Sequence, residues 1–89
     1  MNYHVVLSDP AKKMLKKLDP SVSRVITRWL RKNLEGTSNP RQHGKALTEN
    51  LTGKWRYRIG DYRLIADISD DTVTILVLKV GHRGEIYAS

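Results

Sequence analysis

The feature that most constrains the fold of this chain is a change in the spacing of its apolar residues near residue 53. Before this point apolar residues recur every three or four positions, as in helices that bury one face. After it they alternate or run continuously, as they do in strands. A chain of 89 residues forms one domain, so the two halves must pack on each other. We therefore expect a single α+β domain over residues 1–89, with helices covering one face of a sheet.

The first half predicts one short strand followed by a helical hairpin. Residues 3–7 are rich in strand-forming side chains. The pairs at 9–10 and 19–20 each combine an aspartate that can cap a helix with a proline suited to its first turn. The apolar stripes that follow consist of Ala11, Met14, Leu15 and Leu18, and then of Val22, Val25, Ile26, Trp29, Leu30 and Leu34. Gly36 is a natural end for the second helix.

The second half predicts a connector and three strands. Residues 36–53 contain scattered glycine and proline, which indicates a connector with at most a short helical turn. Residues 55–59 alternate, residues 60–61 (Gly-Asp) suit a two-residue hairpin turn, and residues 62–68 return. The apolar run at 73–80 is typical of a central strand buried on both faces. The expected order is β-α-α-β-β-β, with a two-helix hairpin on one face of a small, mainly antiparallel sheet.

The hairpin turn also predicts which side chains share a face. A two-residue turn places Arg58 opposite Arg63, and Arg56 lies two residues along on the same side. The apolar side chains take the other side, which the helices must cover. Opposed like charges destabilise a sheet, so three clustered arginines do not serve stability. They are either a solvated surface or a phosphate-binding site, because a guanidinium group binds two phosphate oxygens at once.

Polar residues at the end of the last strand add to this pattern. Gly81 permits a sharp exit, after which His82, Arg83 and Tyr87 emerge near the strand end. A histidine exchanges a proton near neutral pH, and an arginine holds a phosphate. A tyrosine stacks on a base. Each residue alone also fits a loop or tail, but the combination with the arginines favours a phosphate-binding site.

Composition narrows the partners and the compartment. The chain has 16 lysine and arginine residues against 9 aspartate and glutamate residues, a formal charge of +7, which favours nucleic acid as a partner. It has no cysteine, so disulfides and thiolate metal sites are excluded. No apolar run reaches the ~20 residues of a membrane span, and no signal peptide precedes the first strand. We expect a cytoplasmic protein. His4 and His43 lack acidic partners and do not predict a metal site.

Three segments resemble the RelE/ParE toxin superfamily, and most closely its RelE branch. They are residues 55–65 (WRYRIGDYRLI), residues 77–83 (VLKVGHR) and residues 85–87 (EIY), and the resemblance extends over nearly the whole chain. It implies the same β-α-α-β-β-β fold, ribosome-dependent cleavage of messenger RNA without metal or cofactor, and neutralisation by a cognate RelB-like antitoxin.

The resemblance also implies roles for individual residues. Arg56 and Arg58 match two catalytic basic positions that are often lysine in this branch. Arg63 matches a phosphate-contacting arginine, Arg83 matches the arginine that stabilises charge at the cleaved phosphate, and Tyr87 matches a tyrosine that stacks on the substrate base. The loop between Arg83 and Tyr87 is shorter here. Arginine in place of lysine also matters, because a group with a pKa above ~12 is a poor general base.

The proton acceptor therefore stays open at this point. One hypothesis assigns His82 as general base or acid. The other holds that an aligned ribose reacts with little help from a protein base. Lys54, Arg41 and Lys45 are further predicted RNA contacts. Two other functions remain: a ParE-like inhibitor that binds DNA gyrase, and a module that binds RNA without cleaving it.

Overall fold

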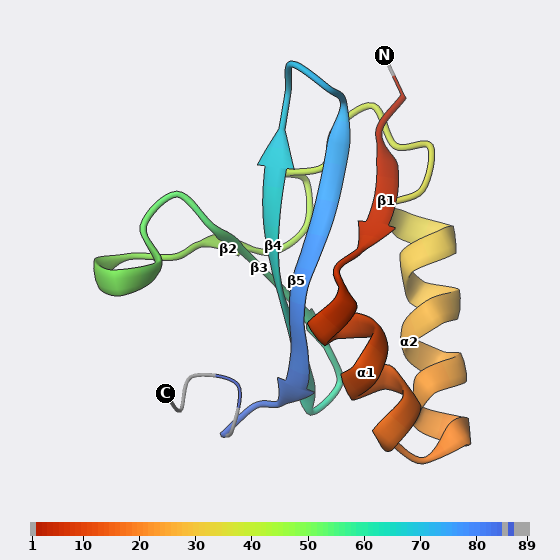
Figure 1. Cartoon of the computed structure of the whole chain (residues 1–89). Helices are drawn as coiled ribbons and strands as arrows, with labels where there is room; N and C mark the ends of the chain where they lie inside the picture. The colour runs from red at the N-terminus through yellow and green to blue at the C-terminus, as the bar shows by residue number, and fades with distance from the viewer. Residues whose placement is uncertain (1, 85, 87–89) are drawn as a thin grey trace.

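The computed structural model describes residues 2–84 and residue 86, and it shows two helices on one face of a five-stranded sheet (Figure 1). The elements are β1 (His4–Leu7), α1 (Asp9–Lys17), α2 (Pro20–Asn33), β2 (Lys45–Ala46), a 3-10 turn (Glu49–Leu51), β3 (Trp55–Ile59), β4 (Tyr62–Ser69) and β5 (Thr74–His82). The strand order is β1-β5-β4-β3-β2, with β1 parallel to β5 and the other pairs antiparallel. The predicted fold class is confirmed; β2 is an addition within the connector.

The helices begin where the capping signals lie, with one shift. Ser8, not Asp9, caps α1, and its hydroxyl accepts a hydrogen bond from the Ala11 N–H at 3.2 Å. Asp9 instead occupies the first turn, where its negative charge interacts favourably with the positive end of the helix dipole. Asp19 caps α2 as predicted and accepts from the Ser21 N–H at 3.0 Å. Neither helix in the described part of the chain is long and apolar enough to cross a membrane.

The core lies between the helices and one face of the sheet. Ile26 and Leu30 of α2, with Leu34 directly after it, are buried there in one cluster with Tyr57 and Leu64. Val25, which we predicted in the apolar stripe of α2, is 57% exposed. The prediction was wrong because one residue turns a helix by ~100°, so Ile26 and Val25 cannot both face the sheet squarely.

The β3–β4 hairpin has the register that its turn predicts. Ile59 pairs with Tyr62, Arg58 with Arg63 and Tyr57 with Leu64. Tyr57 and Leu64 are fully buried on the helix face of the sheet. The side chains that alternate with them therefore project from the opposite face, which carries Arg56, Arg58 and Arg63 and is called the arginine face below.

The last strand is central but is not buried on both faces. β5 lies between β1 and β4, with Ile75, Val77 and Val80 buried against the helices. Lys79 is exposed, and the strand continues to His82 rather than ending at residue 81. The prediction of burial on both faces was wrong because both helices pack on the same side of the sheet, so no helix covers the arginine face (Figure 1).

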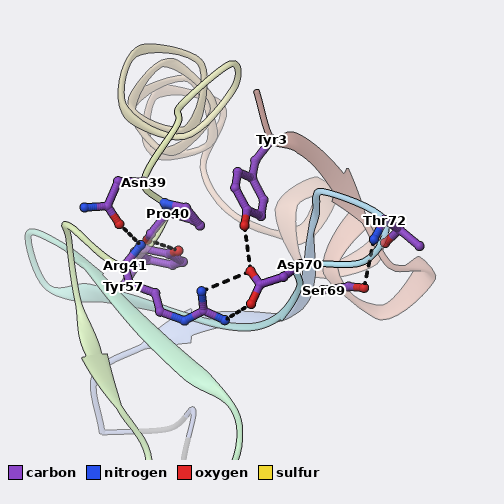
Figure 2. Close-up of polar contacts among 8 residues, drawn as sticks. All are labelled: Tyr3, Asn39, Pro40, Arg41, Tyr57, Ser69, Asp70 and Thr72. Carbon is purple, nitrogen blue, oxygen red and sulfur yellow. Dashed lines mark hydrogen bonds and ion pairs between the residues drawn. The ribbon is translucent and has the colours of Figure 1, made fainter. Parts of the chain in front are cut away.

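The connector is fastened to the sheet at several points. Asp70, in the β4–β5 turn, accepts from both terminal nitrogens of Arg41 at 3.0 and 3.2 Å and from the Tyr3 hydroxyl at 2.6 Å (Figure 2). The buried Tyr57 hydroxyl donates to the Pro40 carbonyl oxygen at 2.7 Å (Figure 2). These bonds hold the chain between α2 and β3 along the edge of the sheet.

A close approach of backbones completes this attachment. Gly44 has φ of +84°, and a Cβ there would lie 2.1 Å from the Arg56 carbonyl oxygen. Next to it, the Trp55 ring nitrogen donates to the His43 carbonyl oxygen at 2.6 Å. Only glycine fits this position without moving the backbone, and the approach allows Lys45 to pair with Arg56 in the β2–β3 ladder.

The outer edge of β1 is closed by the segment that follows α2. The Val5 N–H donates to the Glu35 carboxylate at 2.9 Å, and the Tyr3 N–H donates to the Thr37 carbonyl oxygen at 2.8 Å. His4 contacts the same carboxylate through Nδ1 at 2.8 Å. Hydrogen bonds from Val5 and His4 hold the pKa of Glu35 below its usual range.

Candidate nucleic-acid interface

The arginine face is built from rows of residues paired across the strands. The rows are Arg58–Arg63–Gly81, Lys45–Arg56–Ile65–Lys79 and Asp67–Leu76. Paired residues project to the same side of a sheet, so the ladders place five lysine and arginine side chains on one surface. Lys54 adds a sixth through its ion pair with Asp67. Such a surface attracts a polyanion.

The three predicted arginines differ in how they are held. Arg58 is exposed, whereas Arg56 and Arg63 are half-buried. One terminal nitrogen of Arg63 donates to the carbonyl oxygens of Gly60 and Tyr62 at 2.9 and 3.0 Å, which ties this side chain to the β3–β4 turn. The structure thus places the three arginine residues on one face of two adjacent strands, as the register predicts.

Ile65 shows that the arginine face is not a uniformly wetted surface. It is 1% exposed although it does not face the helices, and its paired neighbours are Arg56 and Lys79. Long cationic side chains cover apolar surface with their aliphatic stems while their charged ends stay in water. An apolar residue is therefore part of this face, between two basic residues in the same row.

The predicted RNA contacts outside the arginines separate into two groups. Lys45 lies opposite Arg56, and Lys54 lies on the same face with its Nζ 3.5 Å from an oxygen of Asp67. Arg41 lies elsewhere: its guanidinium group is engaged by Asp70 in the β4–β5 turn, at the other end of the sheet from the Arg58–Arg63 pair (Figure 2). The bond to Asp70 holds the Arg41 pKa above its usual range. The structure does not bring Arg41 to the arginine cluster.

His82 lies on the wrong side of the sheet to meet the arginines. It pairs with Tyr62, and the two rings meet edge to face with centroids 5.6 Å apart. Tyr62 packs against the core on the helix face. Since Gly81 pairs with Arg63 on the arginine face, the next residue of the strand points away from it. We expected His82 to meet the arginines because we predicted that the strand ends at residues 80–81.

Ile86, which follows β5, lies against the arginine face. A Cβ on Gly81 would lie 3.5 Å from Cβ of Ile86, which is 6% exposed. The Arg83 N–H donates to the Asp61 carbonyl oxygen at 2.8 Å, so Arg83 starts beside the β3–β4 turn, with an exposed side chain. Tyr87, the other predicted tail residue, lies outside the described residues.

Comparison with known proteins decides the family. Residues 5–87 match a family model described as the ParE toxin of type II toxin–antitoxin system, parDE. The chain is also 33% identical over 87 residues to the toxin RelG of Mycobacterium tuberculosis, with 98% of each protein covered. The chain belongs to the RelE/ParE toxin family. A second relative, the toxin RelE of the same organism, is 27% identical and covers 96% of this chain and 86% of its own length.

Solved structures place this RelE-type toxin in the same fold. It matches a chain in the toxin–antitoxin complex RelBE2 of Mycobacterium tuberculosis with a TM-score of 0.84 and 31% identity, covering 93% of this toxin and 100% of that chain. It also matches a chain in the archaeal RelE–RelB complex of Pyrococcus horikoshii with a TM-score of 0.70 and 30% identity, covering 96% and 99%. The arrangement of two helices on a mixed sheet is thus that of RelE toxins.

One cation on the face of this toxin escaped the sequence analysis. Lys79 stands as an interruption in the apolar run at 73–80, and strict alternation from the buried Val77 would turn its side chain toward the helices. The ladder instead pairs it with Ile65. No local sequence signal shows this, because the break in the period of two appears only in the burial of Val77 and Val80, three residues apart.

Proposed function

We propose that this RelE-type toxin is a ribosome-dependent endoribonuclease that cleaves messenger RNA and thereby stops translation. The observation that carries the proposal is the direct opposition of Arg58 and Arg63, with Arg56 beside them, on a face that the helices leave uncovered. Opposed like charges cost stability, and an exposed sheet gains nothing from them unless they bind an anion. Guanidinium groups match the paired oxygens of a phosphate.

The proposed reaction needs no metal. The ribose 2′-hydroxyl gives its proton to water as its oxygen forms a bond to phosphorus. The bond from phosphorus to the 5′-oxygen breaks, and the leaving oxygen takes up a proton from water. The products are a 2′,3′-cyclic phosphate and a 5′-hydroxyl. Negative charge grows on the phosphate oxygens in the transition state, and fixed cations in place beforehand stabilise it. The fixed cations are Arg56, Arg58 and Arg63. The backbone of Arg83 lies beside the β3–β4 turn, at one end of the same face.

The position of His82 bears on the two hypotheses for the proton acceptor. His82 contacts Tyr62 on the helix face, whereas the arginines project from the other face. This placement favours the hypothesis in which alignment of the ribose and charge stabilisation drive the reaction, with little help from a protein base. In that case a small active site depends on the ribosome to hold the message in a reactive conformation.

We propose a RelB-like antitoxin as the partner that keeps the toxin inactive. Two of the similar structures are described as complexes of such a toxin with its antitoxin. A formal charge of +7 favours an acidic or amphipathic antitoxin segment that wraps the helices or covers the arginine face. Binding in excess then holds the toxin inactive by mass action. Both proteins act in the cytoplasm, where messages are translated.

The test is cleavage of a defined message in a reconstituted translation system. We expect new RNA ends with 5′-hydroxyl groups that appear only when ribosomes translate the message. They should still appear when the toxin has been treated with a metal chelator before the assay. A variant with Arg56, Arg58 and Arg63 replaced by glutamine must lose cleavage, while a variant with Lys12, Lys13 and Lys17 replaced by glutamine keeps it. Absence of cleavage by the parent protein on translating ribosomes would overturn the proposal.

A second function is inhibition of DNA gyrase through protein contacts. The observation that favours it is the match of residues 5–87 to a family described as the ParE toxin. This function requires no cluster of arginines. A supercoiling assay with purified gyrase separates the two: inhibition that survives replacement of the three arginines by glutamine, without RNA cleavage, supports gyrase as the target.

A further inference from the structure

The β4–β5 ladder contains an extra residue on β5 near its middle. Leu64 pairs with Val80 and Ala66 pairs with Val77, so a step of two residues on β4 faces a step of three on β5. This is a β-bulge, and the register shift falls between Ile65 and Ala66. Val77 and Val80 both stay buried against the helices.

The bulge is held in place by the residue that begins α1. The Ser8 hydroxyl donates to the Leu78 carbonyl oxygen at 3.0 Å and accepts from the Ala11 N–H at 3.2 Å. The Ser8 N–H donates to the Val77 carbonyl oxygen at 2.9 Å. A ladder interrupted by a bulge leaves backbone groups without strand partners, and Ser8 satisfies one of them. The bulge is therefore stabilised by specific hydrogen bonds from Ser8.

The bulge decides the direction of Lys79. In a regular strand, Val77 and Lys79 would share the helix face. Here Lys79 pairs with Ile65 and is exposed on the arginine face. On β4 its diagonal neighbours are Arg63 and Asp67, and on its own strand Gly81 follows two positions along in the row of Arg58 and Arg63. Bulges near functional sites commonly re-aim one side chain.

We propose that Lys79 is a further substrate-binding residue, which contacts a backbone phosphate of RNA lying across the arginine face next to the phosphate held by the arginines. The proposal rests on the proposed function, because it takes RNA as the occupant of that face. The ladder partner of Lys79 is Ile65, an apolar residue that is 1% exposed. Lys79 extends the line of cations from β3 across β4 to β5. A strand backbone of RNA crossing the sheet would meet them in turn.

The test measures binding of a short single-stranded RNA whose riboses are 2′-O-methylated, so that no cleavage occurs. Each phosphate contact adds ~0.7 to the slope of log affinity against log salt for single strands. We expect Lys79→Met to reduce this slope by about 0.7. The ratio of its Kd to the parent Kd should then fall about two- to threefold as the salt rises from about 50 to about 200 mM. Lys79→Arg, which keeps the charge, must retain the parent slope.

Two control variants separate the possible failures. Lys13→Met removes one charge from the exposed side of α1 and must keep the parent slope. Arg58→Met removes a charge from the arginine face and must lower it. If Arg58→Met lowers the slope and Lys79→Met does not, the role of Lys79 is overturned while RNA remains the ligand of the face. If neither variant lowers it, RNA does not bind there, and the proposed function fails together with this inference.

Discussion

Arg58 and Arg63 stand directly opposite each other in the β3–β4 ladder, on the face of the sheet that the helices leave uncovered. Directly opposed like charges cost ~0.2–1 kcal/mol in a sheet. Arg63 is restrained by its bonds to the β3–β4 turn, while Arg58 is exposed. The pair therefore trades stability for a concentrated positive charge.

Replacing Arg58 with threonine should raise stability and abolish function. Threonine is a good strand former and removes the opposed charge, so we expect the free energy of unfolding to rise by up to about 1 kcal/mol. Cleavage on translating ribosomes should fall by about 10²-fold, as when one preorganised donor to a transition-state oxygen is lost. Urea denaturation at low and high salt checks the first part, because salt should shrink the gain. A destabilised variant would contradict it.

Replacing His82 with alanine should leave the chemistry nearly intact. General acid–base catalysis is worth ~10²–10⁴-fold, so loss of a true base would be obvious. Because His82 contacts Tyr62 on the helix face, we expect single-turnover cleavage within about threefold of the parent, a loss far below the acid–base contribution. A drop of 10²-fold with unchanged stability would restore histidine to the mechanism.

Replacing Ser8 with alanine should destabilise the fold at two points. The variant loses the cap of α1 and the donor to the Leu78 carbonyl oxygen in the bulge. We expect a loss of about 2 kcal/mol in the free energy of unfolding, since a cap contributes ~1 kcal/mol and a carbonyl left without a partner adds to it. Ser21→Ala is the matched control, because the exposed Ser21 hydroxyl contacts only the neighbouring Asp19 carboxylate among the bonds described. Equal losses in the two variants would contradict the double role.

Gly44 and Gly53 offer a matched pair for the connector. Both have positive φ, but only Gly44 has a backbone oxygen where a Cβ would lie. We expect Gly53→Ala to cost about 1–2 kcal/mol from backbone strain alone, and Gly44→Ala to cost distinctly more, since β2 must move away from β3. Thermal unfolding compares the two. Similar melting temperatures would show that the connector yields easily.

Acid should weaken the attachment at Asp70. Hydrogen bonds from Arg41 and then Tyr3 hold the pKa of this carboxyl below its usual range. The unfolded chain then binds more protons between the lowered pKa and the ordinary value of ~3.9, so this contribution to stability is present above that value and is lost as the pH falls through the lowered pKa. Asp70→Asn and Arg41→Met should both show a smaller loss of stability below about pH 4 than the parent. Unchanged acid profiles would exclude this role.

The order of elements and the register of the hairpin could be predicted because both depend on local signals. Periodicity marks the helices, and the turn at residues 60–61 fixes which residue lies opposite Arg58. The side of the sheet taken by His82 and Lys79 could not be predicted in the same way. It depends on where β5 ends and on a bulge held by Ser8, which lies some seventy residues away in the sequence.

The connector escaped prediction for a related reason. Its glycines and proline indicate a loose segment, but its course is set by partners on β1, β3 and the β4–β5 turn. Arg41 looked like an RNA contact because it is basic, and only the fold shows that it meets Asp70. Contacts between distant segments leave no local pattern in a sequence.

The closed edge of β1 has a consequence for the behaviour of the molecule in concentrated solution. A strand from another copy could join this edge only by displacing the Glu35 carboxylate from the Val5 N–H and by breaking the bonds of Tyr3 to the following segment. Exposed sheet edges otherwise act as templates for aggregation. Protonation of Glu35 removes the charge that strengthens its hydrogen bond to Val5, so this edge of the sheet is less firmly held in acid.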